Sequence, residues 1–170
     1  MHELPTIITT KRTMLRRVAP ADAAGWKSFN NAIAKRMPWP IVPSIVYARN
    51  ELLNYVEMWP KERYVYIVLD KKGKIIGDFH LKSIDTKHGR MEFGHALHPS
   101  VWGTGITYEI LDAVRKAVGK TGFTLWCKVE VDNIRSWKSL EKYKATFIGQ
   151  RSYKIDGVAK KMNVYELNNG

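Results

Sequence analysis

The segment LHPSVWGTGITYEIL, from Leu97 to Leu111, constrains the fold of this chain more than any other stretch. An apolar strand ends there, Gly103 and Gly105 follow, and a helix pattern begins directly afterwards. Glycines let a backbone approach a ligand closely, and the free N–H groups and positive dipole end of the helix point at the loop. The segment therefore predicts an anion site between a strand and a helix. It is neither a Walker loop nor a dinucleotide fingerprint, because the spacings that those motifs require are absent.

The remaining periodicity predicts a mixed sheet flanked by helices. Short turns at 70–74 and 85–89 make three consecutive strands antiparallel. We expect an α/β (α+β) fold, a single domain over residues 1–170, with a mostly antiparallel sheet of six to seven strands and about four helices. The expected strands are 13–18, 64–69, 75–83, 91–97, 124–131, 146–153 and 158–167, and the expected helices are 20–36, 45–59, 105–120 and 133–143.

Two of these helices have predicted inward faces that the structure can test directly. The first helix carries Trp26, Phe29, Ile33 and Met37 on one side, and the second is expected to turn Val46, Leu53 and Val56 inward.

Composition narrows the class of protein. The 170 residues are 45% hydrophobic and 26% charged, which is typical of a globular chain, and the net charge is +12. Residues 1–50 and 110–170 each carry +6, whereas residues 51–109 are neutral. Such a balance attracts RNA, an anionic membrane face or a phosphate-rich cofactor, although a merely soluble basic surface explains it equally well.

The lone Cys127 excludes an intramolecular disulfide and a paired-cysteine metal site, and favours a reducing, cytoplasmic setting. No window is apolar enough for a membrane span, the N-terminus lacks the order of a secretory signal, and no cluster has metal-ligand spacing.

Four segments in this order resemble the GNAT N-acetyltransferase family. They are the strand LRRV, the hairpin YVYIVLDKKGKIIG, the segment EFGHALHPSVWGTGITYEIL and the pattern N-x-x-S-x-x-x-L-E-K from Asn133 to Lys142. Within the family the chain is most similar to the RimJ/RimL-type ribosomal-protein-alanine N-acetyltransferases, over nearly its whole length.

The resemblance implies acetyl-CoA as cofactor and a set of residues that bind it. Backbone amides of Gly103, Thr104, Gly105, Ile106 and Thr107 would hold the pyrophosphate. The strand Gly94, His95, Ala96 and Leu97 would splay from its neighbour and pair with the pantetheine arm. Trp102 and Asn133 would lie beside the cofactor, and Trp39 is a candidate for the acceptor groove.

The resemblance also implies two catalytic residues, each with a structural alternative. Glu92 would accept the proton of the amine, directly or through water; alternatively, it is a solvated carboxylate at a strand end. Ser136 would protonate or hydrogen-bond the departing sulfur; alternatively, Asn133 simply caps the helix and Ser136 is an ordinary first-turn residue.

The histidines on the same strands are weaker candidates for the base that takes the proton of the amine. Alternation places Glu92, Gly94, Ala96 and His98 on one face and turns His95 to the other with Phe93, where a core or surface role is expected for it.

Two positions depart from the pattern of the family. Thr107 stands where Gly or Ala is usual, so its side chain would crowd or bind the phosphate. Lys144 and Ala145 replace Gly-Phe, so we expect an altered turn into the next strand.

The sequence thus predicts an acetyl-CoA-dependent N-acetyltransferase that modifies a primary amine, in particular a protein or peptide N-terminal α-amine. At pH 7.5 an α-amine with a pKa of ~7.8 is about one-third neutral, whereas a lysine is roughly 0.1% neutral. The alternative is a non-catalytic CoA- or RNA-binding member of the same fold. Proximity to the ribosome or RNA and a homodimer remain open partner hypotheses, with no membrane partner.

Overall fold

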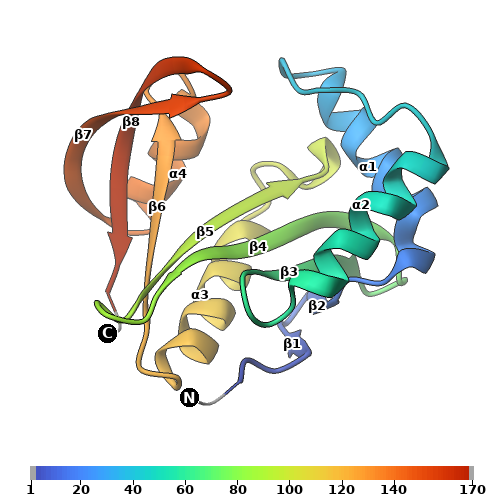
Figure 1. Cartoon of the computed structure of the whole chain (residues 1–170), viewed down its shortest axis with the longest axis horizontal. Coiled ribbons are helices and arrows are strands. Elements are labelled where there is room, and N and C mark those ends of the chain that lie inside the picture. Colours follow the sequence, from blue (N-terminus) through green and yellow to red (C-terminus); the bar gives the residue numbers. More distant parts are fainter. Residues whose placement is uncertain (1–2, 169–170) are drawn as a thin grey trace.

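Helices cover both faces of one sheet because apolar residues fill both sides of its central strands. The computed structural model describes residues 3–168 and contains a single eight-stranded sheet (Figure 1). The strands are β1 (Ile7–Thr9), β2 (Thr13–Arg17), β3 (Tyr64–Asp70), β4 (Ile75–Asp85), β5 (Arg90–Leu97), β6 (Thr124–Glu130), β7 (Thr146–Ile155) and β8 (Val158–Leu167). The helices are α1 (Ala23–Ala34), α2 (Ile45–Met58), α3 (Ile106–Gly119) and α4 (Ile134–Lys142), with short 3-10 turns at Pro20–Asp22 and Pro99–Val101.

The strand order is β1-β2-β3-β4-β5-β6-β8-β7, and every neighbouring pair except β5 and β6 is antiparallel. This confirms the expected fold class and the three antiparallel strands β3, β4 and β5. The sheet has one strand more than the upper estimate. The strand that the sequence did not reveal is β1, whose three residues are too few to show a period of two.

The parallel pair β5 and β6 stays together over only three residues. Arg90 pairs with Thr124 and Glu92 with Trp126, and within residues 3–168 the two strands do not pair with each other beyond this point. Figure 1 shows the two strands diverging from a common base, with α1 and α2 beside one arm and α4 beside the other. The expected splay of β5 from its neighbour is therefore present, and it begins directly after Glu92.

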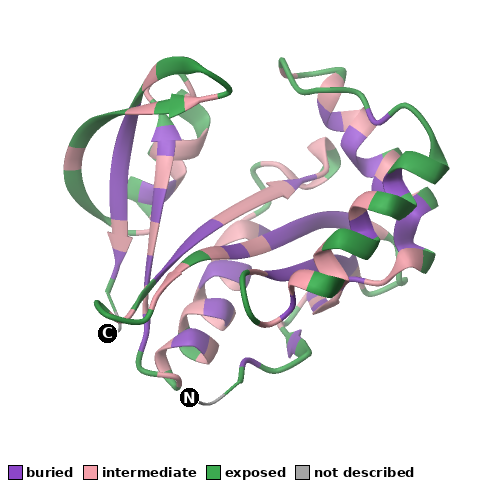
Figure 2. Ribbon diagram, viewed as in Figure 1, coloured by how far each residue is buried: buried purple, intermediate pink, exposed green. Residues whose placement is uncertain are grey.

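Two apolar clusters lie on opposite faces of the sheet (Figure 2). In β3, Tyr66 belongs to the cluster under α3, whereas Val65 and Ile67 belong to the cluster under α1 and α2. The predicted face of α1 is confirmed, since Trp26, Phe29 and Ile33 are buried. Met37 lies beyond the end of α1 and packs against the same cluster.

The predicted face of α2 is wrong for Val46 and Leu53 and right for Val56. Val46 is 69% exposed and Leu53 is 39% exposed, whereas Ala48 and Leu52 are buried. Residues four apart share a helix face, and Val56 extends the row that Ala48 and Leu52 form and packs against the same cluster. Prediction from bulky apolar residues alone missed the small Ala48 and so placed the helix in the wrong rotation.

The turn after α4 keeps its usual hydrogen bonds although it lacks glycine. Lys144 N donates to Glu141 O at 2.8 Å and Ala145 N to Leu140 O at 2.9 Å, which is the Schellman pattern. Lys144 adopts the left-handed conformation that the pattern requires, with φ of +64°. The expectation of an altered turn is therefore wrong in its geometry, and the departure instead places a lysine where glycine is less strained.

Candidate functional site

The loop between β5 and α3 presents backbone N–H groups at the start of a helix. Gly103 and Gly105 have φ of +77° and +81°, which side chains rarely allow. Gly105 is the N-cap of α3, and its backbone N–H has no hydrogen-bond partner within residues 3–168. A Cβ on Gly103 would have no heavy atom within 4 Å, so the backbone there is open to approach. These features fit a pyrophosphate group, because they combine unpaired donors with the positive end of a helix.

Side chains hold this loop in place. Trp102 Nε1 donates to Leu97 O at 2.8 Å, and Thr104 Oγ1 donates to Val101 O at 2.7 Å. Arg12, from the turn between β1 and β2, donates from Nη1 to Thr104 O at 2.9 Å. The loop is therefore fixed from both the strand and the far edge of the sheet.

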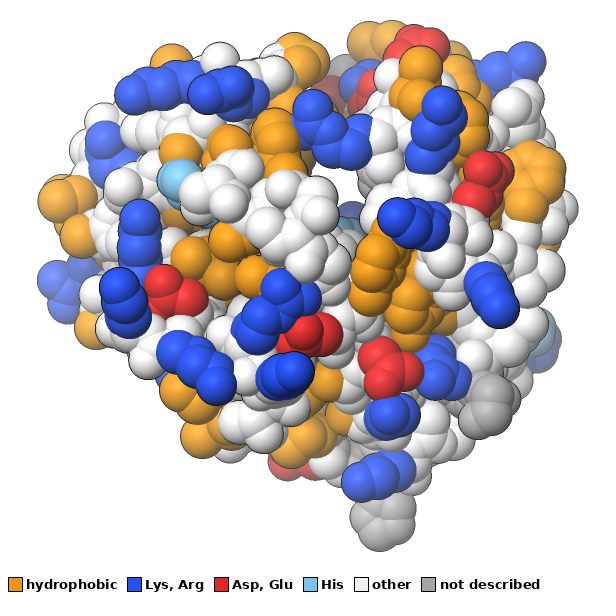
Figure 3. All heavy atoms as spheres, turned by 180° about the vertical axis from the view of Figure 1, so that it is seen from behind, with side chains coloured by type: hydrophobic (Ala, Val, Ile, Leu, Met, Phe, Trp, Pro, Cys, Tyr) orange, Lys and Arg blue, Asp and Glu red, His pale blue; other side chains and the backbone are white. Residues whose placement is uncertain are grey.

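Two cavities meet at the split between β5 and β6. The loop-side cavity, of about 180 Å³, is bordered by Trp102, Gly103 and Thr107. The strand-side cavity, of about 840 Å³, is bordered by Glu92, Gly94 and residues of β6. Both are lined by Trp39, His95, Asn133, Arg135 and Ser136. Seen from behind, the surface is hollowed between the two arms, and Lys and Arg side chains surround the opening (Figure 3).

The structure brings most of the expected site residues to these cavities. The loop-side cavity is also lined by Ala96 and Leu97. Thr104, Gly105 and Ile106 line neither cavity. They lie instead at the surface of the loop and in the first turn of α3, where Ile106 is buried.

Glu92 is buried rather than solvated, with only 3% of its surface exposed. Ser83 Oγ donates to its Oε2 at 2.9 Å, and the ammonium groups of Lys82 and Lys128 lie 3.4 and 3.5 Å from its Oε1. The alternative of a solvated carboxylate at a strand end is therefore wrong. Glu92 is a fixed carboxylate at the point where β5 and β6 separate.

Asn133 caps α4, and the capping bond leaves the Ser136 hydroxyl available. The Asn133 side chain accepts a hydrogen bond from Ser136 N at 3.3 Å. The hydroxyl of Ser136 has no hydrogen-bond partner within the described residues, and Ser136 lines both cavities. The cap predicted as an alternative is thus present, and it is compatible with a chemical role for the hydroxyl.

His95 and Cys127 lie at the split but are poor candidates for proton transfer or nucleophilic attack. His95 stacks on Phe79 and Phe93, with ring centroids 5.8 and 6.2 Å away, as alternation along β5 predicted. Burial lowers the pKa of His95 to about 4, so its ring is neutral at pH 7. Burial, with the Glu92 charge, raises the pKa of the Cys127 thiol to about 12, so the thiol stays protonated.

Sequence reasoning missed several residues of the site. Arg135 stands inside the N-x-x-S pattern, and its guanidinium lies 4.0 Å from the centre of the Trp102 ring. Its position next to Ser136 could have revealed it. No sequence signal connects Lys82 or Lys128 with Glu92, nor Arg12 with the glycine loop.

Comparison with known proteins identifies the family. The profile of the acetyltransferase (GNAT) domain matches residues 12–146. This chain belongs to the GNAT acetyltransferase family. The expected family and its enzyme class, an N-acetyltransferase, are confirmed by this match. A search of curated proteins found no match.

Solved structures of acetyltransferases share the fold. One is RimL, a ribosomal L7/L12 α-N-protein acetyltransferase in complex with coenzyme A, at 19% identity and a TM-score of 0.82, with 95% of this chain and 97% of that chain covered. Another is the ribosomal-protein-S5-alanine acetyltransferase of Vibrio fischeri, at 18% identity and a TM-score of 0.80, with 97% of each chain covered. A third is the microcin C7 self-immunity acetyltransferase MccE in complex with acetyl-CoA and AMP, at 22% identity and a TM-score of 0.81, with 92% of each chain covered.

Two further findings concern other classes of site. Within residues 3–168, no group of His, Cys, Asp or Glu has an arrangement that could hold a metal ion. In the same part of the chain, no helix is long and apolar enough to cross a membrane.

Proposed function

We propose that this enzyme transfers the acetyl group of acetyl-CoA to the α-amine of a protein or peptide N-terminus. The observation that carries the proposal is the meeting of two cavities at the split between β5 and β6. One cavity borders the glycine loop and the other borders Glu92, and Ser136 faces both. A donor and an acceptor entering from opposite sides would meet there, which gives the proximity that acyl transfer needs.

Binding of the donor would rest on the loop and on β5. The N–H groups of Gly103 to Thr107 and the start of α3 would hold the pyrophosphate. The free edge of β5, from Gly94 to Leu97, has no partner strand on the β6 side among the described residues and would pair with the pantetheine arm. The Thr107 side chain lines the loop-side cavity and would donate a further hydrogen bond.

The chemistry requires one proton acceptor and one proton donor. Acetyl-CoA supplies the thioester carbonyl, and the amine nitrogen forms a bond to its carbon while the carbon–sulfur bond breaks. Glu92 would take the proton that the amine loses, directly or through water, and Ser136 would give a proton to the leaving sulfur. An α-amine suits this site, because a larger neutral fraction at pH 7.5 asks less of the base. The unpaired, buried Cys127 fits a reducing cytoplasm.

Two measurements test the proposal. Acetyl-CoA at 100 times its dissociation constant should stabilise the fold by about 2.7 kcal/mol, and a panel of peptides with free N-termini should accept radiolabelled acetyl groups. Binding without transfer to any amine would favour the non-catalytic alternative. The absence of a thermal shift at millimolar acetyl-CoA would contradict both the catalytic proposal and the CoA-binding form of the alternative.

Substitutions separate the two catalytic roles. Ser136→Ala should lower kcat at least tenfold with little change in acetyl-CoA affinity, since the backbone N–H that Asn133 caps is retained. Glu92→Gln should lower the rate most at low pH, where the acceptor amine is mostly charged. Losses below about fivefold in both variants would leave catalysis to proximity alone.

A further inference from the structure

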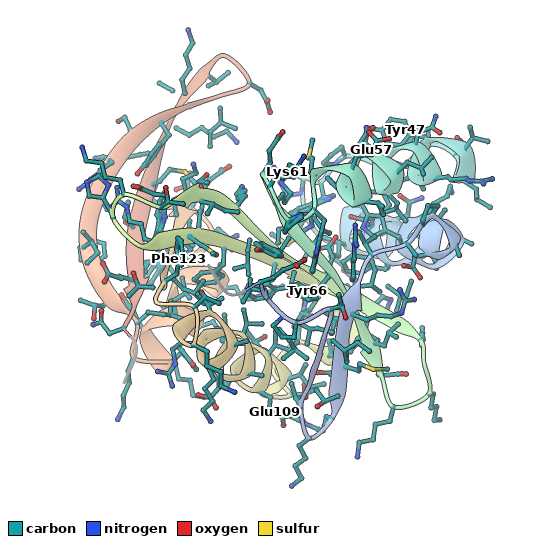
Figure 4. The ribbon with its side chains drawn as sticks, turned by 60° about the horizontal axis from the view of Figure 1, so that its bottom comes forward. Tyr47, Glu57, Lys61, Tyr66, Glu109 and Phe123 are labelled. Atoms are coloured by element: carbon teal, nitrogen blue, oxygen red, sulfur yellow. The ribbon has the colours of Figure 1, made fainter. Side chains whose placement is uncertain are left out.

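Arg12, in the turn between β1 and β2, contacts the glycine loop and the first turn of α3, which lie 92 and 97 residues further along the chain. Its backbone N–H and its Nε donate to the two carboxylate oxygens of Glu109, at 3.2 and 2.6 Å. Its Nη1 donates to Thr104 O at 2.9 Å. Figure 4 shows Glu109 on α3 beside the chain of β1 and β2. One arginine therefore ties the first turn of α3 to the carbonyl of the glycine loop.

The bond to Thr104 O fixes the direction of the next N–H. The Thr104–Gly105 peptide is trans, so its C=O and N–H point in opposite directions. With the carbonyl turned toward Arg12, the N–H of Gly105 points away from Arg12. Because Gly105 carries no side chain that could fix this peptide, the loop needs an external contact to select one orientation.

Arg12 also balances the charge of Glu109. That carboxylate lies in the first turn of α3, at the helix end that would receive an anion. An unpaired carboxylate there would repel phosphate, whereas the ion pair with Arg12 neutralises it. Both effects of Arg12 favour the binding of an anion at the loop.

We propose that Arg12 is a positioning residue for the phosphate groups of the donor, acting through the Thr104 carbonyl and the Gly105 N–H. The proposal rests on the proposed function, since it requires acetyl-CoA at the loop. It makes a specific claim: Arg12 matters for the phosphates of the donor and has no part in the transfer step.

The experiment compares two donors on the full-length chain. Acetyl-CoA carries the phosphates, and S-acetylpantetheine has the same thioester without them. Arg12→Ala should raise the KM for acetyl-CoA about tenfold with kcat unchanged, and should leave kcat/KM for S-acetylpantetheine within twofold of the parent. Arg12→Lys should raise the KM for acetyl-CoA about threefold, because one ammonium cannot reproduce both the Nη1 bond to Thr104 O and the Nε bond to Glu109 Oε1. A loss of the same size for both donors would overturn the proposal.

Arg16→Ala is the matched control. Arg16 lies on the adjoining strand β2, forms an ion pair with Asp22 and has a side-chain exposure of 32%, against 37% for Arg12. Its removal should lower thermal stability without changing the ratio between the two donors. An equal change of that ratio in both variants would show a merely structural effect.

Calorimetry separates this proposal from the proposed function. The parent should bind CoA, and Arg12→Ala should bind it about tenfold more weakly. Unchanged CoA affinity in Arg12→Ala would overturn the role of Arg12 alone. Absence of CoA binding by the parent would overturn the donor site and, with it, the role of Arg12.

Discussion

The two connecting segments that border the cavities are built differently. The glycine loop, from Leu97 to Thr107, is fixed by hydrogen bonds from Trp102, Thr104 and Arg12. The connection between α1 and α2 has Trp39 42% exposed and Ile41 71% exposed. Two bonds between the Asn31 side chain and the Val42 backbone, together with the buried Val42 side chain, attach it to the rest of the fold.

This difference has a physical consequence for binding. Backbone donors that bind a phosphate group must be held in one direction, because hydrogen bonds weaken steeply when they are misaligned. An exposed apolar connection instead gains contact area when a ligand covers it. We therefore expect the loop to act as a rigid donor site and the α1–α2 connection to adapt to the acceptor.

Breaking the loop should have the largest effect. Gly105→Val should lower CoA affinity a hundredfold or more, because a branched side chain disfavours φ of +81° and would displace the N–H groups. Gly157→Val is the control, because Gly157 has the same φ of +81° in the β7–β8 turn and open space around it. Calorimetry should show a loss of affinity only in the first variant. Parallel losses would mean that strain, and not the loop, is responsible.

His95, which borders both cavities, should make the fold sensitive to acid. Its pKa of about 4 in the folded chain lies below the ordinary 6.5. Between pH 6.5 and 4 the unfolded chain therefore binds the proton while the folded chain does not, and stability falls as the pH falls through this window. The loss should be roughly 2 to 3 kcal/mol. In denaturant unfolding, His95→Phe should lose less stability than the parent between pH 6.5 and 4, and the difference should equal this amount. An equal loss in both proteins would contradict the role of His95 in acid sensitivity.

Truncation in the α1–α2 connection should affect the acceptor more than the donor. Trp39→Ala should raise the KM for a peptide acceptor about tenfold, since one aromatic contact contributes roughly 1 to 2 kcal/mol. The KM for acetyl-CoA should change less. Ile41→Ala is the control, because Ile41 lies in the same connection but lines neither cavity. A larger effect on acetyl-CoA would assign Trp39 to the donor side.

The smallest effect concerns the end of α4, the helix that carries Ser136. Lys144→Gly should raise the free energy of unfolding by about 1 kcal/mol, because glycine adopts φ of +64° without a Cβ clash. Lys142→Gly, at the last residue of the same helix, should lower it by up to about 1 kcal/mol. Thermal and denaturant melts would check the opposite signs, and a loss in both variants would contradict the strain at Lys144.

Local patterns predicted most elements but not their rotation or their partners. Seven strands and four helices follow from periods and turns within about ten residues, and the loop at Gly103 and Gly105 lies where the sequence places it. The rotation of α2 was wrong because it depends on what the helix packs against. The burial of Glu92 and its two lysine neighbours was likewise hidden, since Lys82 and Lys128 come from the strands on either side of β5.

The sequence by itself determined the strand–loop–helix segment that carries the glycine loop, because glycines and apolar periods act on their own neighbourhood. Only the tertiary structure decided that β5 leaves β6 after Glu92 and that Arg12 reaches the loop 92 residues further along the chain. Contacts of that separation form when the sheet assembles, and their free energy depends on the packing of every strand between them. The site therefore has a local half, readable as a pattern, and a distant half, set by the fold.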